Sequence, residues 1–256
     1  MKLSVNPIDT YEGRNVDAMP KLLADGRIPM SVANLMHYRM GQSATFSDWK
    51  TNYFDSSDLI VYNSKDSGKA KFVFSVDRNQ KITENGRKAL GLITPNARLS
   101  SGAIELTPEQ YQSINGIEVA MSNLGKTESH LTQDEILGHK VWRILARHPS
   151  EVPAEFAEDE KLLQEYSTWV AKQTNSNTNM GVYLDSLGKV PKLRAWCVDR
   201  LDYGSVAGGA GGLGNDRGRF VGIAPEAPNA RILRPTLAQS LDVINQNLGG
   251  LEIRTK

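Results

Sequence analysis

The spacing of apolar side chains predicts helices in the middle of the chain. Thr107 and Thr132 each stand three residues before a Gln or Glu, which is the pattern of a capping box at a helix N-terminus. The helix after Thr132 should continue to Pro149, because one apolar stripe runs along it through Leu137, Val141, Ile144 and Leu145. A further helix is expected at 157–173, with one face formed by Leu162, Tyr166, Trp169 and Val170.

Runs of β-branched and aromatic residues predict the strands. Residues 59–63 and 69–76 should form a hairpin, because the residues between them favour turns. Residues 179–184 read as another strand. Strands at 194–201 and 218–224 then enclose a stretch of different composition.

The two ends of the chain have weaker patterns. Before residue 54 we expect loops around one helix, which Ser31 would cap and in which Val32, Leu35, Met36 and Arg39 would share one face. Residues 84–92 read as a short helix, and 93–106 as a loop that contains Pro and Gly. A capped helix is expected at 236–248, near the C-terminus.

The segment between the last two strands, residues 202–217, has a composition found nowhere else in the chain. We call it the window. Six of its sixteen residues are Gly, and it contains no Lys, Glu, Gln, Met or Trp. Those five types make up 49 of the 256 residues, so sixteen consecutive positions lack them by chance about 3% of the time. They are also the five types that an Asn codon randomised at both adenines cannot encode. We therefore interpret the flanking strands as fixed in sequence and the window as free to vary in sequence.

The window resembles the variable region of proteins that are diversified by retroelements, particularly archaeal and viral ones. The pattern S-x-A-x-G-x-x-x-L-x-x-x-x-G-R at 205–219 and the sequence FVGIAPEA at 220–227 carry this resemblance. It extends upstream through DSSDLIVY at 55–62, ENGRKAL at 84–90, ARHPSEVPAEFAED at 146–159 and TNMGVY at 178–183. In that family an error-prone reverse transcriptase rewrites the adenine positions of one gene segment, and a C-type-lectin fold displays the result.

The resemblance implies an α+β chain with a C-type-lectin-like fold, N-terminal additions and a C-terminal helix. The additions, with the hairpin, would span 1–106, and the lectin-like domain 107–256. It also implies a non-enzymatic receptor-recognition protein that binds a protein or cell-surface ligand. Few anchoring side chains lie in this window, so we expect multivalent binding. The ligand-binding residues would be Asp202, Tyr203, Gly204, Val206, Gly208, Ala210, Gly211, Gly212, Gly214, Asn215, Asp216 and Arg217.

Two other interpretations of the window stay open. An enzyme could use a glycine-rich loop to bind an anion, because the backbone N–H groups of such loops hold phosphates. The window lacks the GK[ST] sequence and the helix start that follow in a nucleotide-binding loop. The window could also be an inert linker of a structural subunit. Against that, long loops in compact domains usually bind something.

The remaining composition argues against several classes of function. Thirty basic and 29 acidic residues give a net charge of +1, so no overall field attracts nucleic acid or an anionic membrane. Cys197 is the single cysteine, which excludes an internal disulfide and the cysteine chemistry of formylglycine-generating enzymes, and its apolar neighbours favour burial. The calcium-dependent sugar motif of animal lectins is missing.

No pattern of catalytic or metal-binding residues emerges from the sequence. His130, His139 and His148 are spaced so that they would alternate between the faces of a helix and could not converge on one ion. We therefore expect no catalytic residues, metal or cofactor. No signal peptide and no apolar run of membrane-spanning length is expected, and the location stays open between a virion, a cell surface and the cytoplasm.

Overall fold

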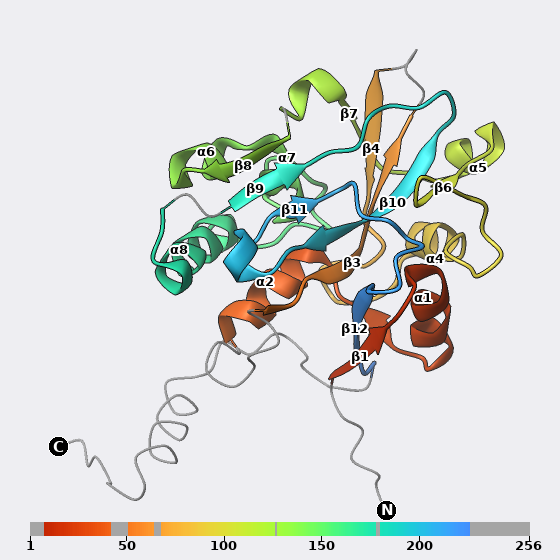
Figure 1. Ribbon diagram of the computed structural model, residues 1–256, viewed down its shortest axis with the longest axis horizontal. Helices are drawn as coiled ribbons and strands as arrows, with labels where there is room; N and C mark the ends of the chain where they lie inside the picture. Colours follow the sequence, from red (N-terminus) through yellow and green to blue (C-terminus); the bar gives the residue numbers. More distant parts are fainter. Residues whose placement is uncertain (1–7, 42–50, 64–67, 126, 178–179, 226–256) are drawn as a thin grey trace, which may run out of the picture.

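A mixed sheet forms the centre of the computed structural model, which describes residues 8–41, 51–63, 68–125, 127–177 and 180–225. The strands follow one another across the sheet in the order β1 (Ile8–Glu12), β12 (Arg219–Ile223), β3 (Phe54–Tyr62), β10 (Lys192–Val198), β11 (Ala207–Gly208), β9 (Met180–Tyr183) and β8 (Glu128–Leu131) (Figure 1). Strands β11 and β12 are consecutive in the chain, yet β10 and β3 lie between them. The segment that joins β11 to β12 must therefore pass across two strands.

The hairpin expected near residue 60 is confirmed, because β3 pairs antiparallel with β4 (Lys69–Val73). Strand β12 runs parallel to β3, and β11 runs parallel to β9. The expectation of a loop at 93–106 is wrong, because Leu99 pairs with Ile104 in a small hairpin. The remaining strands are β2 (Ile28–Pro29), β5 (Leu99–Ser100), β6 (Ala103–Glu105) and β7 (Ile117–Ala120).

The capping boxes predicted at Thr107 and Thr132 are both formed, and Ser31 accepts a hydrogen bond from the Asn34 N–H at 3.1 Å. The described helices are α1 (Asn15–Ala24), α2 (Val32–Gly41), α4 (Glu84–Leu90), α5 (Pro108–Ser113), α6 (Gln133–Gly138), α7 (Lys140–Leu145) and α8 (Leu162–Thr174), with short 3₁₀ turns at Met121–Asn123 and Leu201–Tyr203. None of the helices in the described ranges is long and apolar enough to span a membrane.

Three expectations about helices need correction. The helix after Thr132 is interrupted at His139, whose Nδ1 accepts the Val141 N–H at 3.3 Å and so caps a second helix. Helix α8 begins at Leu162, five residues later than expected. The region before residue 54 contains β1 and α1 as well as α2, and the internal Pro20 of α1 obscured its pattern. The helix expected at 236–248 lies outside the described residues.

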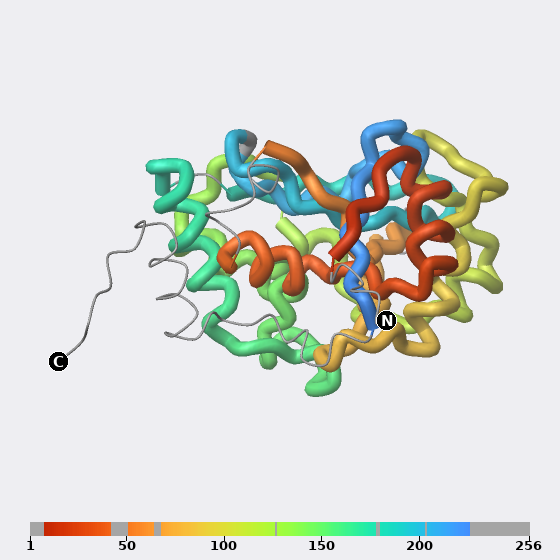
Figure 2. Tube along the Cα trace, turned by 90° about the horizontal axis from the view of Figure 1, so that it is seen from below, coloured from red at the N-terminus to blue at the C-terminus, as the bar shows by residue number. Residues whose placement is uncertain are grey.

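Strand β3 is buried along its whole length because helices cover both faces of the sheet. Ile60 and Tyr62 pack in one cluster with α2, α7 and α8, whereas Leu59 and Val61 pack in a second cluster with α1, α4 and α5. Figure 2 shows α1 and α4 on one side of the molecule and α2 and α8 on the other. The sheet also draws strands from both sides of residue 106, where we placed the domain boundary, and that boundary stays a prediction.

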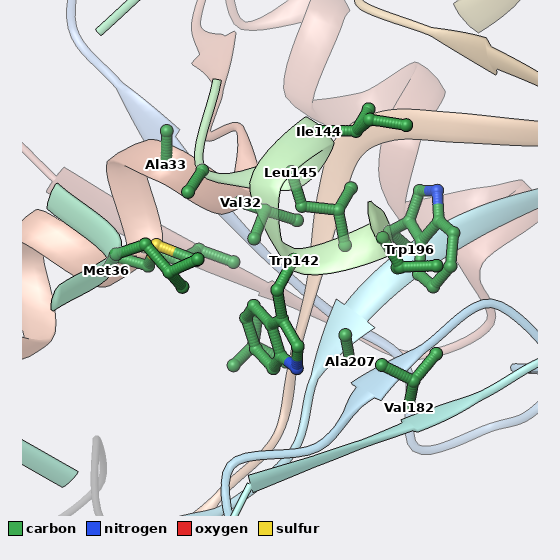
Figure 3. Close-up of a cluster of buried hydrophobic side chains, with 14 of the residues drawn as sticks. Val32, Ala33, Met36, Trp142, Ile144, Leu145, Val182, Trp196 and Ala207 are labelled. Atoms are coloured by element: carbon green, nitrogen blue, oxygen red, sulfur yellow. The ribbon is translucent and has the colours of Figure 1, made fainter. Parts of the chain in front are cut away.

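The first cluster is built around Trp196, which is fully buried. Its ring stacks on that of Phe72 with 5.5 Å between centroids. Figure 3 shows side chains from α2, α7 and strands β9 to β11 meeting in this cluster. A ring of this size contributes several kcal/mol when it is buried, on the order of 3–5 by large-to-small substitutions. The strand that leads into the window is therefore firmly held.

A buried ion pair joins the segment at 146–159 to the sheet. Arg147 and Asp58 are each 1% exposed, with 3.0 Å between Nη2 and Oδ1. The guanidinium of Arg147 lies over the Phe74 ring at 5.1 Å, and Asp58 also accepts the Val32 N–H at 2.8 Å. Removal of one member of such a pair leaves a buried charge without compensation. The pair therefore fixes α2 and the segment after α7 against the same strand.

Candidate functional site

The window begins with a 3₁₀ turn (Leu201–Tyr203), forms β11 and then crosses to β12. Its short strand β11 pairs with both β10 and β9. Leu213 is fully buried in the second cluster, and its carbonyl accepts the Val16 N–H of α1 at 3.2 Å. The window therefore crosses the sheet on the face that packs against α1.

Side chains and main-chain groups outside the window hold its central part through backbone atoms. The Tyr62 hydroxyl donates to the Gly209 carbonyl at 2.9 Å, and Arg194 Nη1 donates to the Gly211 carbonyl at 2.9 Å. The Gly209 N–H in turn donates to the Tyr183 carbonyl at 2.8 Å, and the Leu213 N–H donates to the Gly102 carbonyl at 2.7 Å. None of these bonds involves a side chain of the window. They satisfy main-chain carbonyls, which every residue type has, and N–H groups, which every type except Pro has.

The beginning of the window is held by Arg39, which is fully buried in α2. Its Nη1 donates to the hydroxyls of Tyr166 and Ser205, each at 3.1 Å, and its Nη2 donates to the Val198 carbonyl at 3.2 Å. The hydroxyls of Tyr166 and Ser205 are 2.5 Å apart. Ser205 has a left-handed backbone with φ of 44°. This serine is thus a structural residue, which explains why it belongs to the pattern of the resemblance and not to the expected binding residues.

The predicted binding residues divide into three groups by exposure. Asp202, Ala210, Asn215, Asp216 and Arg217 are exposed. Gly208, Gly211, Gly212 and Gly214 are half-buried. Gly204 and Val206 are buried, and nothing is described for the side chain of Tyr203. The expectation of a free middle is wrong for Val206, whose side chain packs into the protein at 5% exposure. Leu213, a fixed position of the pattern and not an expected binding residue, is fully buried at 0% exposure.

Several glycines lie too close to the rest of the protein for a side chain to be added without movement. A Cβ at Gly209 would lie 2.7 Å from the Tyr62 hydroxyl and 2.9 Å from the Trp196 ring. A Cβ at Gly208 would lie 2.7 Å from Cys197 Sγ, which a rotation of the thiol could relieve. No atom lies nearer than 3.8 Å to a Cβ built at Gly211 or Gly212. These last two positions therefore accept side chains more readily.

The two ends of the window meet at a cleft with a volume of about 560 Å³. Asp199 and Arg200, which precede the window, line it together with Asp216 and Arg217, which end it. The other walls come from residues 12–13 after β1, 51–53 before β3, and 218–219. The sequence does not predict that these residues line the cleft, because no local pattern connects Glu12 or Tyr53 with residue 217.

The charges of the cleft are balanced and partly paired. Three acids, Glu12, Asp199 and Asp216, line it with three arginines, Arg200, Arg217 and Arg219. Arg219 pairs with Glu12 at 2.7 Å, and Arg200 pairs with Asp202 at 3.1 Å. The Tyr53 hydroxyl donates to the Arg217 carbonyl, and burial raises the pKa of Tyr53 to about 12, so that the hydroxyl keeps its proton at neutral pH. The lining of the cleft is therefore polar, with acidic and basic side chains in equal number.

The thiol beside the window is kept protonated, and several N–H groups around the window are already bonded. Burial raises the pKa of the Cys197 thiol, which keeps the sulfur in its unreactive neutral form. The N–H groups of Gly204, Asn215 and Gly218 donate to carbonyls within or beside the window, so they do not converge on an anion. No group of three His, Cys, Asp or Glu side chains in the described ranges is arranged to hold a metal ion.

Asp55 links the window's C-terminal end to the sheet. It is buried in β3, its Oδ2 accepts the Arg219 N–H at 2.9 Å, and burial raises its pKa from 3.8 to about 6. Since the folded state holds the proton more tightly than the unfolded state, this group lowers the stability of the fold as pH rises from about 4 to about 6.

We predict that Asp55→Asn removes this pH dependence. Asn retains an oxygen that can accept the Arg219 N–H and carries no charge. The stability of the variant relative to the parent should therefore increase by on the order of 2–3 kcal/mol between pH 4 and pH 7 and then stay constant. Urea unfolding of both proteins across this range measures the difference, in which the titration of all other groups cancels. A difference that does not change with pH would show that Asp55 titrates normally.

Comparisons with known proteins support the fold. No family model matches the sequence. No curated protein matches it either. A solved structure described as "Accommodation of massive sequence variation in Nanoarchaeota by the C-type lectin fold" aligns with a TM-score of 0.59 at 15% sequence identity, over 87% of this chain and 100% of that chain. The α+β arrangement of helices around a mixed sheet is thus a C-type-lectin fold.

Proposed function

We propose that this protein is a non-enzymatic receptor-recognition protein whose binding surface is the exposed part of the window, diversified by retroelement-directed mutagenesis of adenines. The proposal depends on one observation. The segment whose composition fits randomised Asn codons is the segment that residues outside it hold through main-chain atoms. Such a segment can change its exposed side chains and keep its conformation.

The exposed positions of the window lie where a ligand can reach them. Asp216 and Arg217 line the cleft, while Ala210 is exposed near the centre of the window. Recognition surfaces obtain most of their affinity from a few aromatic and Arg side chains, and the window supplies Arg217 among its exposed residues. This copy of the window should therefore bind weakly at each site, and several copies acting together would raise the avidity.

The proposed partner is a protein on a cell surface, and the proposed setting is an archaeon or an archaeal virus. The fold supports this setting, since the similar solved structure is described in terms of massive sequence variation in Nanoarchaeota. An enzyme with an anion-binding loop is less well supported. The window leads into strand β12 and not into a helix, and the N–H groups of Gly204, Gly209 and Asn215 are already used within the protein.

We predict that the window tolerates change at its exposed positions but not at the buried Leu213. A variant with Asp202→Asn, Ala210→Tyr, Asp216→His and Arg217→Ser should lose at most about 0.5 kcal/mol of stability per substitution, because these side chains are exposed. Leu213→Asn, which the same codons also encode, should cost about 2–5 kcal/mol, because it removes apolar contacts and buries an amide. Urea unfolding of the two variants gives the comparison. Equal losses would contradict the division into surface and scaffold.

We also predict a genomic signature of diversification. A reverse-transcriptase gene should lie near this gene, with a repeat that matches the codons for residues 195–225 except at adenines. Sequencing of the locus and of closely related gene copies provides the test. If no such gene and repeat are found, or if the copies differ no more in the window than elsewhere, the window is an inert loop or belongs to an enzyme.

A further inference from the structure

An exposed aromatic side chain lies beside the window but does not belong to it. Tyr183, the last residue of β9, is 47% exposed. In the described ranges only Val190 is a comparably exposed large hydrophobic residue. Large apolar rings are usually buried, and an exposed one at a candidate binding surface is a contact that a partner can use.

The register of the sheet places Tyr183 on the same face as the centre of the window. Tyr183 pairs with Gly208, Gly208 with Cys197, and Cys197 with Asp55. Paired residues project their side chains to the same face of a sheet. The alternate row, in which Val182, Ala207 and Val198 are paired, points into the first cluster. The side chains of the row that starts at Tyr183 therefore project from the opposite face of the sheet.

Gly208 adds no side chain to the row next to Tyr183. It has no side chain, and it separates Tyr183 from Cys197, which is itself half-buried. The hydrogen bond from the Gly209 N–H to the Tyr183 carbonyl fixes the window's main chain relative to β9. The main chain of Tyr183 thus keeps one position beside the window for any set of side chains at the exposed positions.

The same row leads to the cleft. Asp55, at the other end of the row, bonds to the main chain of Arg219, which lines the cleft. Three strand spacings separate Tyr183 from Asp55, or roughly 14 Å. A patch on a folded protein spans this distance readily, because a protein interface usually buries about 800 Å² on each partner.

We propose that Tyr183 is a fixed aromatic anchor, which contacts the protein partner of every variant of the window while the exposed window residues select among partners. This inference rests on the proposed function. Tyrosine suits the role because its ring buries a large apolar area with little loss of side-chain entropy. An apolar side chain of the partner would lie against the ring and over Gly208.

The test compares libraries in which positions 202, 210, 216 and 217 are randomised with NNC codons. One library keeps Tyr183, and the others carry Tyr183→Thr, Tyr183→Phe or Val190→Ala. Thr removes the ring but retains strand propensity, so the fold should survive, and thermal melts of single clones check this. Each displayed library is selected against the same folded proteins, namely lysozyme, serum albumin and ovalbumin, and the dissociation constants of the best clones are measured.

If Tyr183 is the anchor, the best clones with Tyr183→Thr should bind every target about tenfold or more weakly than those from the parent library. Clones with Tyr183→Phe should retain most of the affinity, and those with Val190→Ala should be unaffected. If the best clones of the Tyr183→Thr library and of the parent library bind with equal affinity, Tyr183 is not the anchor, and the proposed function is unaffected. If no library, including the parent, gives binders to any target, the proposed function fails and the anchor with it.

Discussion

The hydrogen bonds from the scaffold to the window's main chain are the interactions on which the rest of the account depends. Tyr62 and Arg194 donate to the carbonyls of Gly209 and Gly211, and Arg39 holds the start of the window through Ser205. Each such bond contributes about 1 kcal/mol net, and somewhat more where the donor is charged, while a buried carbonyl left without a partner would cost more. Because these bonds use backbone atoms or a residue of the fixed pattern, they impose one conformation on many sequences.

This arrangement lets the window vary in sequence and still be ordered before it binds a ligand. A glycine-rich segment loses much conformational entropy when it is ordered, which would weaken binding if the loss occurred on contact with a ligand. Here the scaffold orders the segment beforehand, and Leu213 fixes it against α1. The exposed residues, such as Ala210 and Arg217, then contribute to recognition from a surface already in place.

The sequence was informative where the determinants are local. The capping boxes at Thr107 and Thr132 and the hairpin of β3 and β4 follow from neighbouring residues, and the fold class followed from the resemblance. The composition of the window identified the candidate site, which stays a prediction. Composition could not show that Val206 is buried, since the permitted residue types include apolar ones. Composition also could not show that Arg39 binds Ser205. The two residues are 166 positions apart in the sequence, and folding alone brings them together.

The central claim is that the scaffold, together with the fixed residues Ser205 and Leu213, determines the conformation of the window whatever residues occupy its exposed positions. A crystal structure of the protein with its exposed window positions replaced by Tyr, His and Ser tests it most directly. The account predicts that the Cα atoms of the window stay within about 1 Å of their positions, as in other preorganised binding surfaces. It also predicts that Tyr62 and Arg194 still donate to the carbonyls of residues 209 and 211. A window that takes another path, with those donors bonded elsewhere, would contradict the account.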